Sequence, residues 1–318
     1  MKLFPPPTHG VAKPIYVSVG GAWPPVLSPT PAGRPGFSPE AAGRQGSPAS
    51  SGRRLAVAAG SVEELARRIL EKLGAAPCGV AVDVDGTLTV ERRRGSFRID
   101  LGAVEALRSF VDSGGVAMLV TGNAAPVVAG LGRYLGAMGP HVAENGCVVY
   151  HSGRVWSACR YTARAAAEAL EEELSWLLVP SWQNRCRLHD FAFLARDRSV
   201  DPGSLVEEAR SVLEARGLRA RLQSSGYALH VRPLDASKGR GIRLAAGLAG
   251  LEPGCIVAVG DSAIDVEMGE AAGLLAAVGN ADPELKKAAD IVLPGESGRA
   301  ARLLLEAATL ARRLAKQA

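Results

Sequence analysis

Short apolar runs alternate with helical patterns along most of this chain, and this alternation constrains its fold more than any other feature. Residues 79–83, 116–120 and 255–259 are short and rich in β-branched residues, which predicts strands buried on both faces. Apolar residues at helical spacing over 101–113 and 125–136 predict helices between them. Strands separated by helices indicate an α/β fold with a parallel sheet and helices on both of its faces.

The same alternation of strands and helices continues before residue 79 and after residue 259. Ser61 and Asp100 stand where helix N-caps are expected, each directly before a helical run. The further predicted elements are helices over 62–73, 264–272 and 297–316, strands over 141–143, 274–278 and 289–293, and a hairpin over 147–157.

The middle of the chain has a different order of elements. It predicts a helix over 163–178, a strand over 189–195, a helix over 203–215 and strands over 219–223 and 226–231. This order indicates an α+β insert, and inserts of this kind cover sites at the carboxyl ends of parallel strands. We therefore predict a disordered Pro/Gly-rich extension over 1–60, a core made of 61–158 and 233–318, and a cap over 159–232.

The N-terminal segment carries the charge imbalance of the chain. Eleven of the 20 prolines lie in residues 1–53, and a segment of that composition does not readily form a packed core. Residues 1–54 hold six of the 37 Lys and Arg residues and one of the 32 Asp and Glu residues, so the net charge of +5 arises there. The rest of the chain is neutral, so we expect no nucleic-acid-binding surface on it.

Three features bear on location. No run of 18 apolar residues occurs, so we expect no membrane-spanning helix. Pro5, Pro6 and Pro7 stand where a signal peptide would place its apolar helix, so we expect a cytoplasmic protein without a secretory leader. The cysteines lie far apart and form no Cys-x-x-Cys pair, so we expect reduced thiols at Cys78, Cys147, Cys159, Cys186 and Cys255.

The strongest chemical signal is the sequence Asp-Val-Asp-Gly-Thr-Leu-Thr, which runs from Asp83 to Thr89 directly after a predicted buried strand. Gly86 permits a turn that brings Asp83 and Asp85 into one cleft. One aspartate can then attack phosphorus while the other protonates the departing oxygen. A turn with two solvated acids is the alternative.

A second acidic motif, Gly-Asp-Ser-Ala-Ile-Asp, runs from Gly260 to Asp265 and again follows an apolar strand. Asp261 and Asp265 are four residues apart, which places them on one side of a first helical turn. Carboxylates in that position can hold Mg²⁺, which prefers oxygen ligands. Alternatively, each acid caps the helix or interacts with its dipole.

Two further groups suit a phosphate ligand. Thr121 and Gly122 end another predicted strand and offer a hydroxyl and a backbone amide. Lys238, at a predicted helix start, offers a positive charge. Each signal is weak alone, but their order along the chain and their positions at strand ends make the combination strong.

These four motifs resemble, in order and residue type, those of the haloacid dehalogenase superfamily phosphatases. Ala143–Gly146 and Gly279–Val292 resemble the branch of that family whose cap lies between the second and third motifs. The resemblance covers about residues 78–318 and is greatest to the archaeal-type phosphoglycolate phosphatases. It implies a Rossmann-like parallel sheet core with an inserted α+β cap.

The resemblance also implies roles for the acidic residues. Asp83 would be the nucleophile and a ligand of Mg²⁺, and Asp85 would be the general acid and then the general base, binding the metal through its backbone carbonyl. Asp261 would bind Mg²⁺ directly. Asp265 would bind or orient the metal shell and hold Lys238.

The phosphate group would be held by Thr121, Gly122 and Lys238. These roles predict a Mg²⁺-dependent phosphatase that hydrolyses 2-phosphoglycolate to glycolate and phosphate through an aspartyl-phosphate. A sugar-phosphate phosphatase or a phosphomutase of the same superfamily is the alternative enzyme, and a non-catalytic protein binding a phospho-ligand or a polyanion is the alternative class. The expected partner is a small phosphorylated metabolite, with no nucleic acid and no membrane, and the expected assembly is a monomer or homodimer.

Substrate selection would fall to the cap in this family. Arg185, Arg187 and His189 lie close together in the predicted cap, where cations could meet a carboxylate on the substrate. Ordinary structural roles are the alternative for all three residues.

Overall fold

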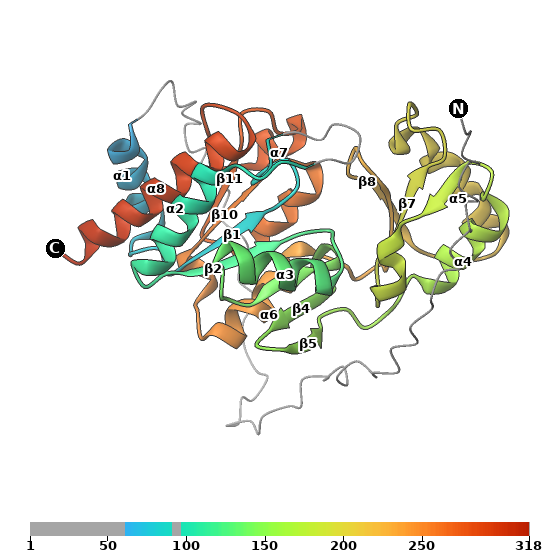
Figure 1. Ribbon diagram of the computed structural model, residues 1–318, viewed down its shortest axis with the longest axis horizontal. Coiled ribbons are helices and arrows are strands. Elements are labelled where there is room, and N and C mark those ends of the chain that lie inside the picture. Colours follow the sequence, from blue (N-terminus) through green and yellow to red (C-terminus); the bar gives the residue numbers. More distant parts are fainter. Residues whose placement is uncertain (1–60, 91–96, 318) are drawn as a thin grey trace, which may run out of the picture.

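Two β-sheets organise the chain, as Figure 1 shows for a computed structural model that describes residues 61–90 and 97–317. Within these residues the larger sheet has eight strands in the order β12-β11-β10-β1-β2-β3-β4-β5. The strands are β1 (Gly79–Asp83), β2 (Val116–Val120), β3 (His141–Ala143), β4 (Val148–His151), β5 (Arg154–Ser157), β10 (Ile256–Gly260), β11 (Leu274–Ala277) and β12 (Ile291–Val292). The predicted disorder of residues 1–60 lies outside the described residues.

Parallel pairing places three strand ends together at one edge of this sheet. Strand β1 pairs in parallel with β10 on one side and with β2 on the other, and Gly79 is in register with both Ile256 and Val116. Among the described pairs of this sheet, only β3–β4 and β4–β5, at one end of it, are antiparallel. The carboxyl ends of β1, β2 and β10 therefore meet at one place.

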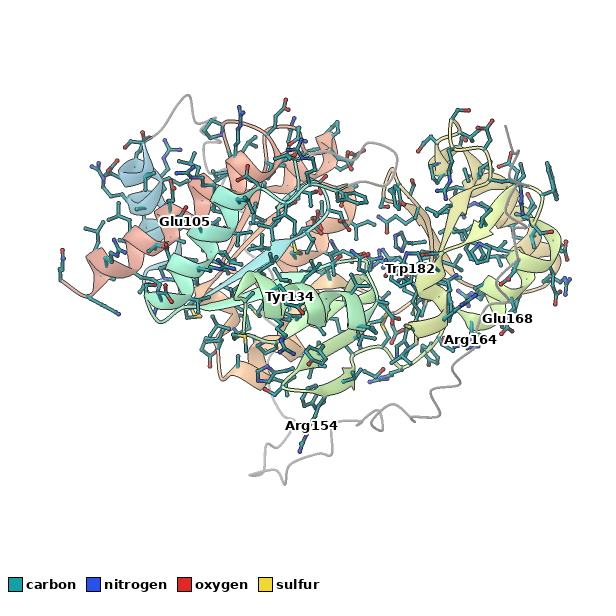
Figure 2. All side chains as sticks on the ribbon, viewed as in Figure 1. Glu105, Tyr134, Arg154, Arg164, Glu168 and Trp182 are labelled. Carbon is teal, nitrogen blue, oxygen red and sulfur yellow. A yellow bond between two sulfur atoms is a disulfide. The ribbon has the colours of Figure 1, made fainter. Side chains whose placement is uncertain are left out.

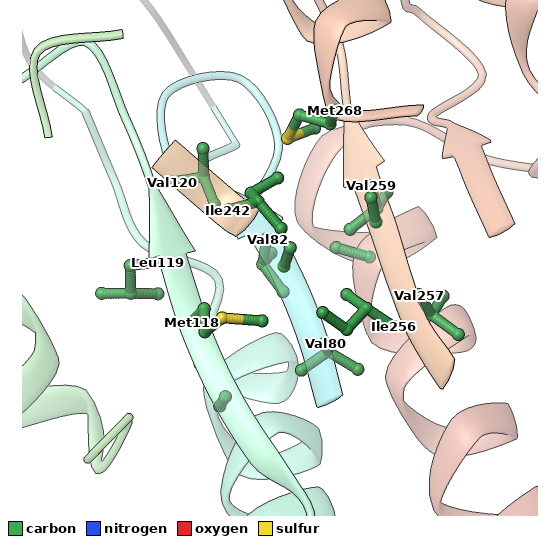
Figure 3. Packing of buried hydrophobic residues seen from close by; sticks show 14 of the residues in the cluster. Val80, Val82, Met118, Leu119, Val120, Ile242, Ile256, Val257, Val259 and Met268 are labelled. Carbon is green, nitrogen blue, oxygen red and sulfur yellow. The ribbon is translucent and has the colours of Figure 1, made fainter. Parts of the chain in front are cut away.

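Helices cover the sheet on both faces, which confirms the predicted fold class. Helix α8 packs against both α1 and α2, while α6 packs against the 3₁₀ helix η6 across the sheet from them (Figure 1). Figure 3 shows how Val80 and Val82 pack between the apolar residues of β2 and β10. The helices are α1 (Val62–Leu73), α2 (Leu101–Asp112), α3 (Ala125–Leu135), α6 (Lys238–Ala249), η6 (Ala263–Ala271), α7 (Pro283–Ala288) and α8 (Ser297–Ala315).

A smaller antiparallel sheet, with the order β6-β7-β9-β8, forms between β5 and α6. Its alternating residues face two ways: Phe191 and Phe193 pack against α4 and α5, whereas Ala192 and Leu194 point to the other side. The elements are α4 (Arg164–Glu173), β6 (Leu178–Pro180), η3 (Trp182–Cys186), β7 (Phe191–Ala195), η4 (Pro202–Leu205), α5 (Val206–Ala215), β8 (Arg221–Ser224) and β9 (Leu229–Arg232).

We call β6–β9 with α4, α5, η3 and η4 the cap, and the larger sheet with its helices the core. The residue boundaries given for these domains from the sequence stay predictions. Two local expectations were wrong. The predicted helix over 264–272 is a 3₁₀ helix. The predicted helix over 163–178 ends at Glu173, a turn follows it, and Leu178 begins β6, where it is in register with Ala195.

Two disulfides correct the expectation of reduced thiols. Cys78 is bonded to Cys255 across a sequence separation of 177, with a Cα–Cα distance of 5.2 Å. They pair because they directly precede β1 and β10, which are neighbours in the sheet. Cys147 is bonded to Cys159, with a Cα–Cα distance of 4.7 Å, and Cys186 of the cap is free.

A search for membrane-spanning helices among the described residues finds none of sufficient length and hydrophobicity.

Candidate active site

The strand ends that meet at one edge of the core sheet bring the predicted site residues together. Asp83 is the last residue of β1, Asp85 lies in the turn that follows, and Asp261 comes directly after β10. These three aspartates line one cavity with Gly122 and Lys238. The turn after β1 depends on Gly86, which has a φ of +91° and whose amide donates to Thr89 Oγ1.

Lys238 forms the electrostatic centre of the site. It is buried, and its Nζ donates to Asp83 Oδ1 at 2.8 Å and to Asp265 Oδ1 at 2.5 Å. Although burial favours the neutral amine, the charges of Asp265 and Asp83 outweigh it and raise the pKa of Lys238. The ammonium therefore stays charged next to Asp83.

Asp265 is held by protein donors on both of its oxygens. Besides the bond from Lys238, its Oδ2 accepts hydrogen bonds from the amides of Asp261 and Ser262 and from Ser262 Oγ. Gly260 allows this approach, because a Cβ at that position would lie 2.4 Å from Asp265 Oδ2. Asp265 therefore fixes the positions of Asp261 and Lys238.

The carboxylates of Asp83, Asp261 and Asp265 could hold a divalent metal ion. Each offers an oxygen, and these oxygens lie within 4.8 Å of one another. With Lys238, the three carboxylates sum to a charge of −2 when all four groups are ionised. Burial raises the pKa of Asp83 to about 7 against the opposing charge of Lys238, and its Oδ2 is buried with no hydrogen-bond partner among the described residues. A divalent cation would supply that partner and neutralise the excess charge.

Thr121 is buried and is not among the residues that line the cavity. Its Oγ1 accepts hydrogen bonds from the amide of Asn123 at 3.1 Å and from Asn123 Nδ2 at 2.9 Å. Asn123 itself lines the cavity, and its Nδ2 also donates to Asp85 Oδ2 at 2.8 Å. Asn123 is thus a site residue that the sequence analysis did not single out, although it is the next residue but one after Thr121.

The cap closes the cavity from the opposite side. Its lining residues come from η3 and the residues that flank it, from β7 and β9, and from the turn between β8 and β9. The cap residues at the cavity are Ser181, Gln183, Arg187, Ala192, Leu194, Ser225, Tyr227, Ala228 and His230.

A buried polar cluster joins the cap to the core at this cavity. His230 Nδ1 lies 3.0 Å from Asp190 Oδ1, and Asn145 Nδ2 donates to Asp190 Oδ2 at 2.6 Å. Arg187 donates to the carbonyl of Gly122 at 2.8 Å and lies 3.5 Å from Asp190 Oδ1. Burial opposes the ionisation of Asp190, but the charges of His230 and Arg187 hold its pKa below the usual value.

The cationic cluster expected in the cap is only partly present at the cavity. Arg187 lines the cavity, but Arg185 is exposed and lies outside its lining. His189 bonds to Ser157 Oγ and to the carbonyl of Tyr161, where the chain passes from core to cap. His230, which no sequence motif indicated, lines the cavity instead.

Comparison with known proteins agrees with this geometry. A profile of the haloacid dehalogenase-like hydrolases matches residues 200–297. A protein of Thermoplasma acidophilum with a solved structure is 27% identical, with a TM-score of 0.60 over 71% of this chain and 95% of that one. A sucrose-phosphatase of Synechocystis, 16% identical with a TM-score of 0.54 over 71% of this chain and 95% of its own, shares the fold.

Sequence relatives narrow the class. The phosphoglycolate phosphatase of Metallosphaera sedula is 43% identical over 68% of this chain and 91% of its own length, and phosphoglycolate phosphatase 1 of Saccharolobus solfataricus is 38% identical over 70% and 92%. The chain therefore belongs to the haloacid dehalogenase-like hydrolases, within the group of the archaeal-type phosphoglycolate phosphatases. It is a phosphatase.

Proposed function

We propose that this phosphatase hydrolyses 2-phosphoglycolate to glycolate and phosphate, with Mg²⁺ and through an aspartyl-phosphate intermediate. The observation that carries the proposal is the placement of Asp83 and Asp85 at one strand end, with Lys238 bonded to Asp83. A nucleophile, a second carboxyl group and a fixed cation in one cavity are what phosphoryl transfer to a side chain requires.

In the first step an oxygen of Asp83 attacks phosphorus, and the bond between phosphorus and the ester oxygen breaks. The departing oxygen takes its proton from Asp85. In the second step water attacks the phosphorus of the aspartyl-phosphate and gives a proton to Asp85. The bond to Asp83 then breaks, so that phosphate leaves and both aspartates return to their starting states.

Lys238 and Gly122 support these steps from the core. The ammonium of Lys238 lies beside Asp83 and would face the phosphoryl oxygens, and the amide of Gly122, a residue that lines the cavity, would donate to them. Thr121 would hold the phosphoryl group as predicted, and its Oγ1 also accepts hydrogen bonds from the backbone and side chain of Asn123.

Asp83 and Asp261 would hold Mg²⁺ together with the backbone carbonyl of Asp85, and Asp265 would orient them. The bound metal would neutralise charge on the transferring phosphoryl group. The fit rests on the three clustered carboxylates and on the unpartnered Oδ2 of Asp83.

The cap supports the choice of a small substrate with its own carboxylate. Arg187 and His230 line the cavity opposite the aspartates, and both can donate to an anion when charged. Relatives named phosphoglycolate phosphatase support the same choice.

The test is phosphate release from 2-phosphoglycolate and from a panel of sugar phosphates, with Mg²⁺ and with EDTA, for the wild type and Asp83→Asn. We expect release that needs the metal, prefers 2-phosphoglycolate and disappears in Asp83→Asn. The exposed Asp112 provides the control variant Asp112→Asn, which should keep the wild-type rate. A preference for sugar phosphates would favour a sugar-phosphate phosphatase, and an isomerised phosphate ester instead of free phosphate would favour a phosphomutase.

The proposal includes a cytoplasmic protein that acts on a small phosphorylated metabolite as a monomer or homodimer. Two disulfides fit that location where the cytoplasm preserves them, as it does in hyperthermophilic archaea. Fractionation of cells of the source organism, with thiol alkylation at lysis, tests the cytoplasmic location and the presence of both disulfides in the cell.

A further inference from the structure

A chain of hydrogen bonds runs from the cap to Asp85 through two side-chain amides. Gln183 of η3 accepts a hydrogen bond from the amide of Ala124 through Oε1 at 2.7 Å. Its Nε2 donates to Asn123 Oδ1 at 2.7 Å, and Asn123 Nδ2 donates to Asp85 Oδ2 at 2.8 Å. This series of hydrogen bonds therefore connects the cap to Asp85, the proposed general acid.

The donor and the acceptor in each of these hydrogen bonds follow from the first one, in which the amide of Ala124 is the donor. The amide of Ala124 is a backbone N–H and can only donate, so the atom of Gln183 that meets it must be the oxygen. The nitrogen of Gln183 then faces Asn123, which must present its oxygen there and its nitrogen to Asp85. Gln183 thus settles which way round the Asn123 amide lies.

The orientation of Asn123 matters to two residues of the core. The same Nδ2 donates to Asp85 and to Thr121 Oγ1, and a reversed amide would place an oxygen against the Asp85 carboxylate. Two acceptors facing each other repel, so reversal would displace the Asp85 side chain. Correct placement of Asp85 therefore depends on a side chain of the cap.

Gln183 is well placed for this role because η3 lies where the cap meets the core. Figure 2 shows its chain neighbour Trp182 on the side of the cap that faces the core. Gln183 lines the cavity with Asn123 and Asp85, whereas Trp182 is 70% exposed. The contact of Gln183 with residues 123 and 124 exists only while the cap lies against the core.

We propose that Gln183 is a positioning residue, which orients Asp85 through Asn123 and so makes proton donation to the leaving group depend on docking of the cap. The proposal rests on the proposed function, in which Asp85 is the general acid. Gln183 itself takes no part in bond breaking.

The test compares two esters whose leaving groups differ in their need for a proton. Glycolate leaves 2-phosphoglycolate as an alkoxide that must be protonated, whereas 4-nitrophenolate leaves 4-nitrophenyl phosphate without help. In Gln183→Ala we expect kcat/KM for 2-phosphoglycolate to fall about tenfold, and kcat/KM for 4-nitrophenyl phosphate to fall no more than about twofold.

Asn184 provides a matched control in the same 3₁₀ helix. Its side chain makes two hydrogen bonds of 3.0 Å, both to the backbone of Ala192 within the cap. Asn184→Ala therefore removes as many bonds as Gln183→Ala without touching the core, and we expect it to lower both kcat/KM values by the same small factor.

A second pair of variants separates polarity from packing. Gln183→Glu keeps the shape and the acceptor for Ala124 but removes the donor to Asn123, so we expect a loss at least as large as in Gln183→Ala, again selective for 2-phosphoglycolate. Asn184→Asp adds the same charge to the same helix and should not reproduce that selectivity. In Asn123→Ala, the further change Gln183→Ala should have no added effect, because both act through one chain of bonds.

The outcomes distinguish this proposal from the proposed function. Equal losses on both esters in Gln183→Ala, or a profile matching that of Asn184→Ala, would mean that Gln183 only docks the cap and would overturn the inference while leaving the phosphatase intact. A wild-type protein that releases phosphate from neither ester would overturn the proposed function, and the inference with it.

Discussion

The core and the cap build their shares of one cavity in opposite ways. The core supplies Asp83, Asp85 and Asp261 from strand ends and turns that parallel pairing brings together. The cap supplies Gln183 and His230 from a 3₁₀ helix and from the open face of an antiparallel sheet. In the proposed function, the core would therefore carry the chemistry, whereas the cap would orient the reacting groups and select the substrate.

The two regions also differ in covalent constraint. Among the described residues, the Cys78–Cys255 disulfide lies within the core. The second disulfide joins Cys147 of the core to Cys159, which lies in the connection from β5 to the cap. The cap has only the free Cys186. A core fixed in place beneath a cap without cross-links of its own suits a site whose cover opens and closes.

The largest expected effect tests the chemical half of this comparison. Asp85→Asn removes the proton donor while keeping the size of the side chain, so kcat for 2-phosphoglycolate should fall by about 10²–10⁴-fold. Steady-state phosphate release measures it. A loss below tenfold would show that Asp85 is not the general acid, and would contradict the proposal that the core carries the chemistry.

Metal affinity should respond next most strongly, again through the core. Asp261→Ala removes one carboxylate of the clustered three, so the Mg²⁺ concentration for half-maximal activity should rise at least about 10–100-fold. A metal titration of EDTA-treated enzyme measures the change. An unchanged half-maximal concentration would place the metal elsewhere.

If the cap selects the substrate, a change in the cap should affect KM. His230→Ala should raise KM for 2-phosphoglycolate about tenfold, because a hydrogen bond to the carboxylate of the substrate is lost, and should change KM for 4-nitrophenyl phosphate little. His189→Ala is the matched control, since His189 lies outside the cavity lining. Equal changes in the two variants would deny His230 a role in selection.

The smallest expected effect on activity concerns the disulfides, which should act on stability. Replacing Cys78 and Cys255 with serine should lower the free energy of unfolding by about 2–4 kcal/mol, and the Cys147 and Cys159 pair should cost less because its loop is shorter. Cys186→Ser is the control and should change it by less than about 0.5 kcal/mol. Urea unfolding monitored by circular dichroism measures all three.

Much of the core could be predicted because its signals are local. Each acidic motif directly follows a buried strand, and parallel strands end at one edge of a sheet, so Asp83 and Asp261 could be placed together from sequence alone. Asp100 and Ser61 cap their helices as expected, each accepting a bond from an amide three residues on.

The cap contacts could not be predicted, because they join residues far apart in the chain. Gln183 meets Asn123 across 60 positions and His230 meets Asp190 across 40, and no local pattern marks such pairs. The disulfide of Cys78 has the same cause, since its partner is 177 residues away.

The Cys78–Cys255 disulfide has a consequence for the chain after it has lost its fold. Asp83 lies five residues beyond Cys78, and Asp261 lies six residues beyond Cys255. An oxidised unfolded chain therefore keeps these two carboxylates on a short tether instead of letting them separate by the length of the intervening sequence. Their effective concentration toward each other stays high. The disulfide has already closed the loop between the two acidic motifs, so refolding does not bear the entropy cost of closing it.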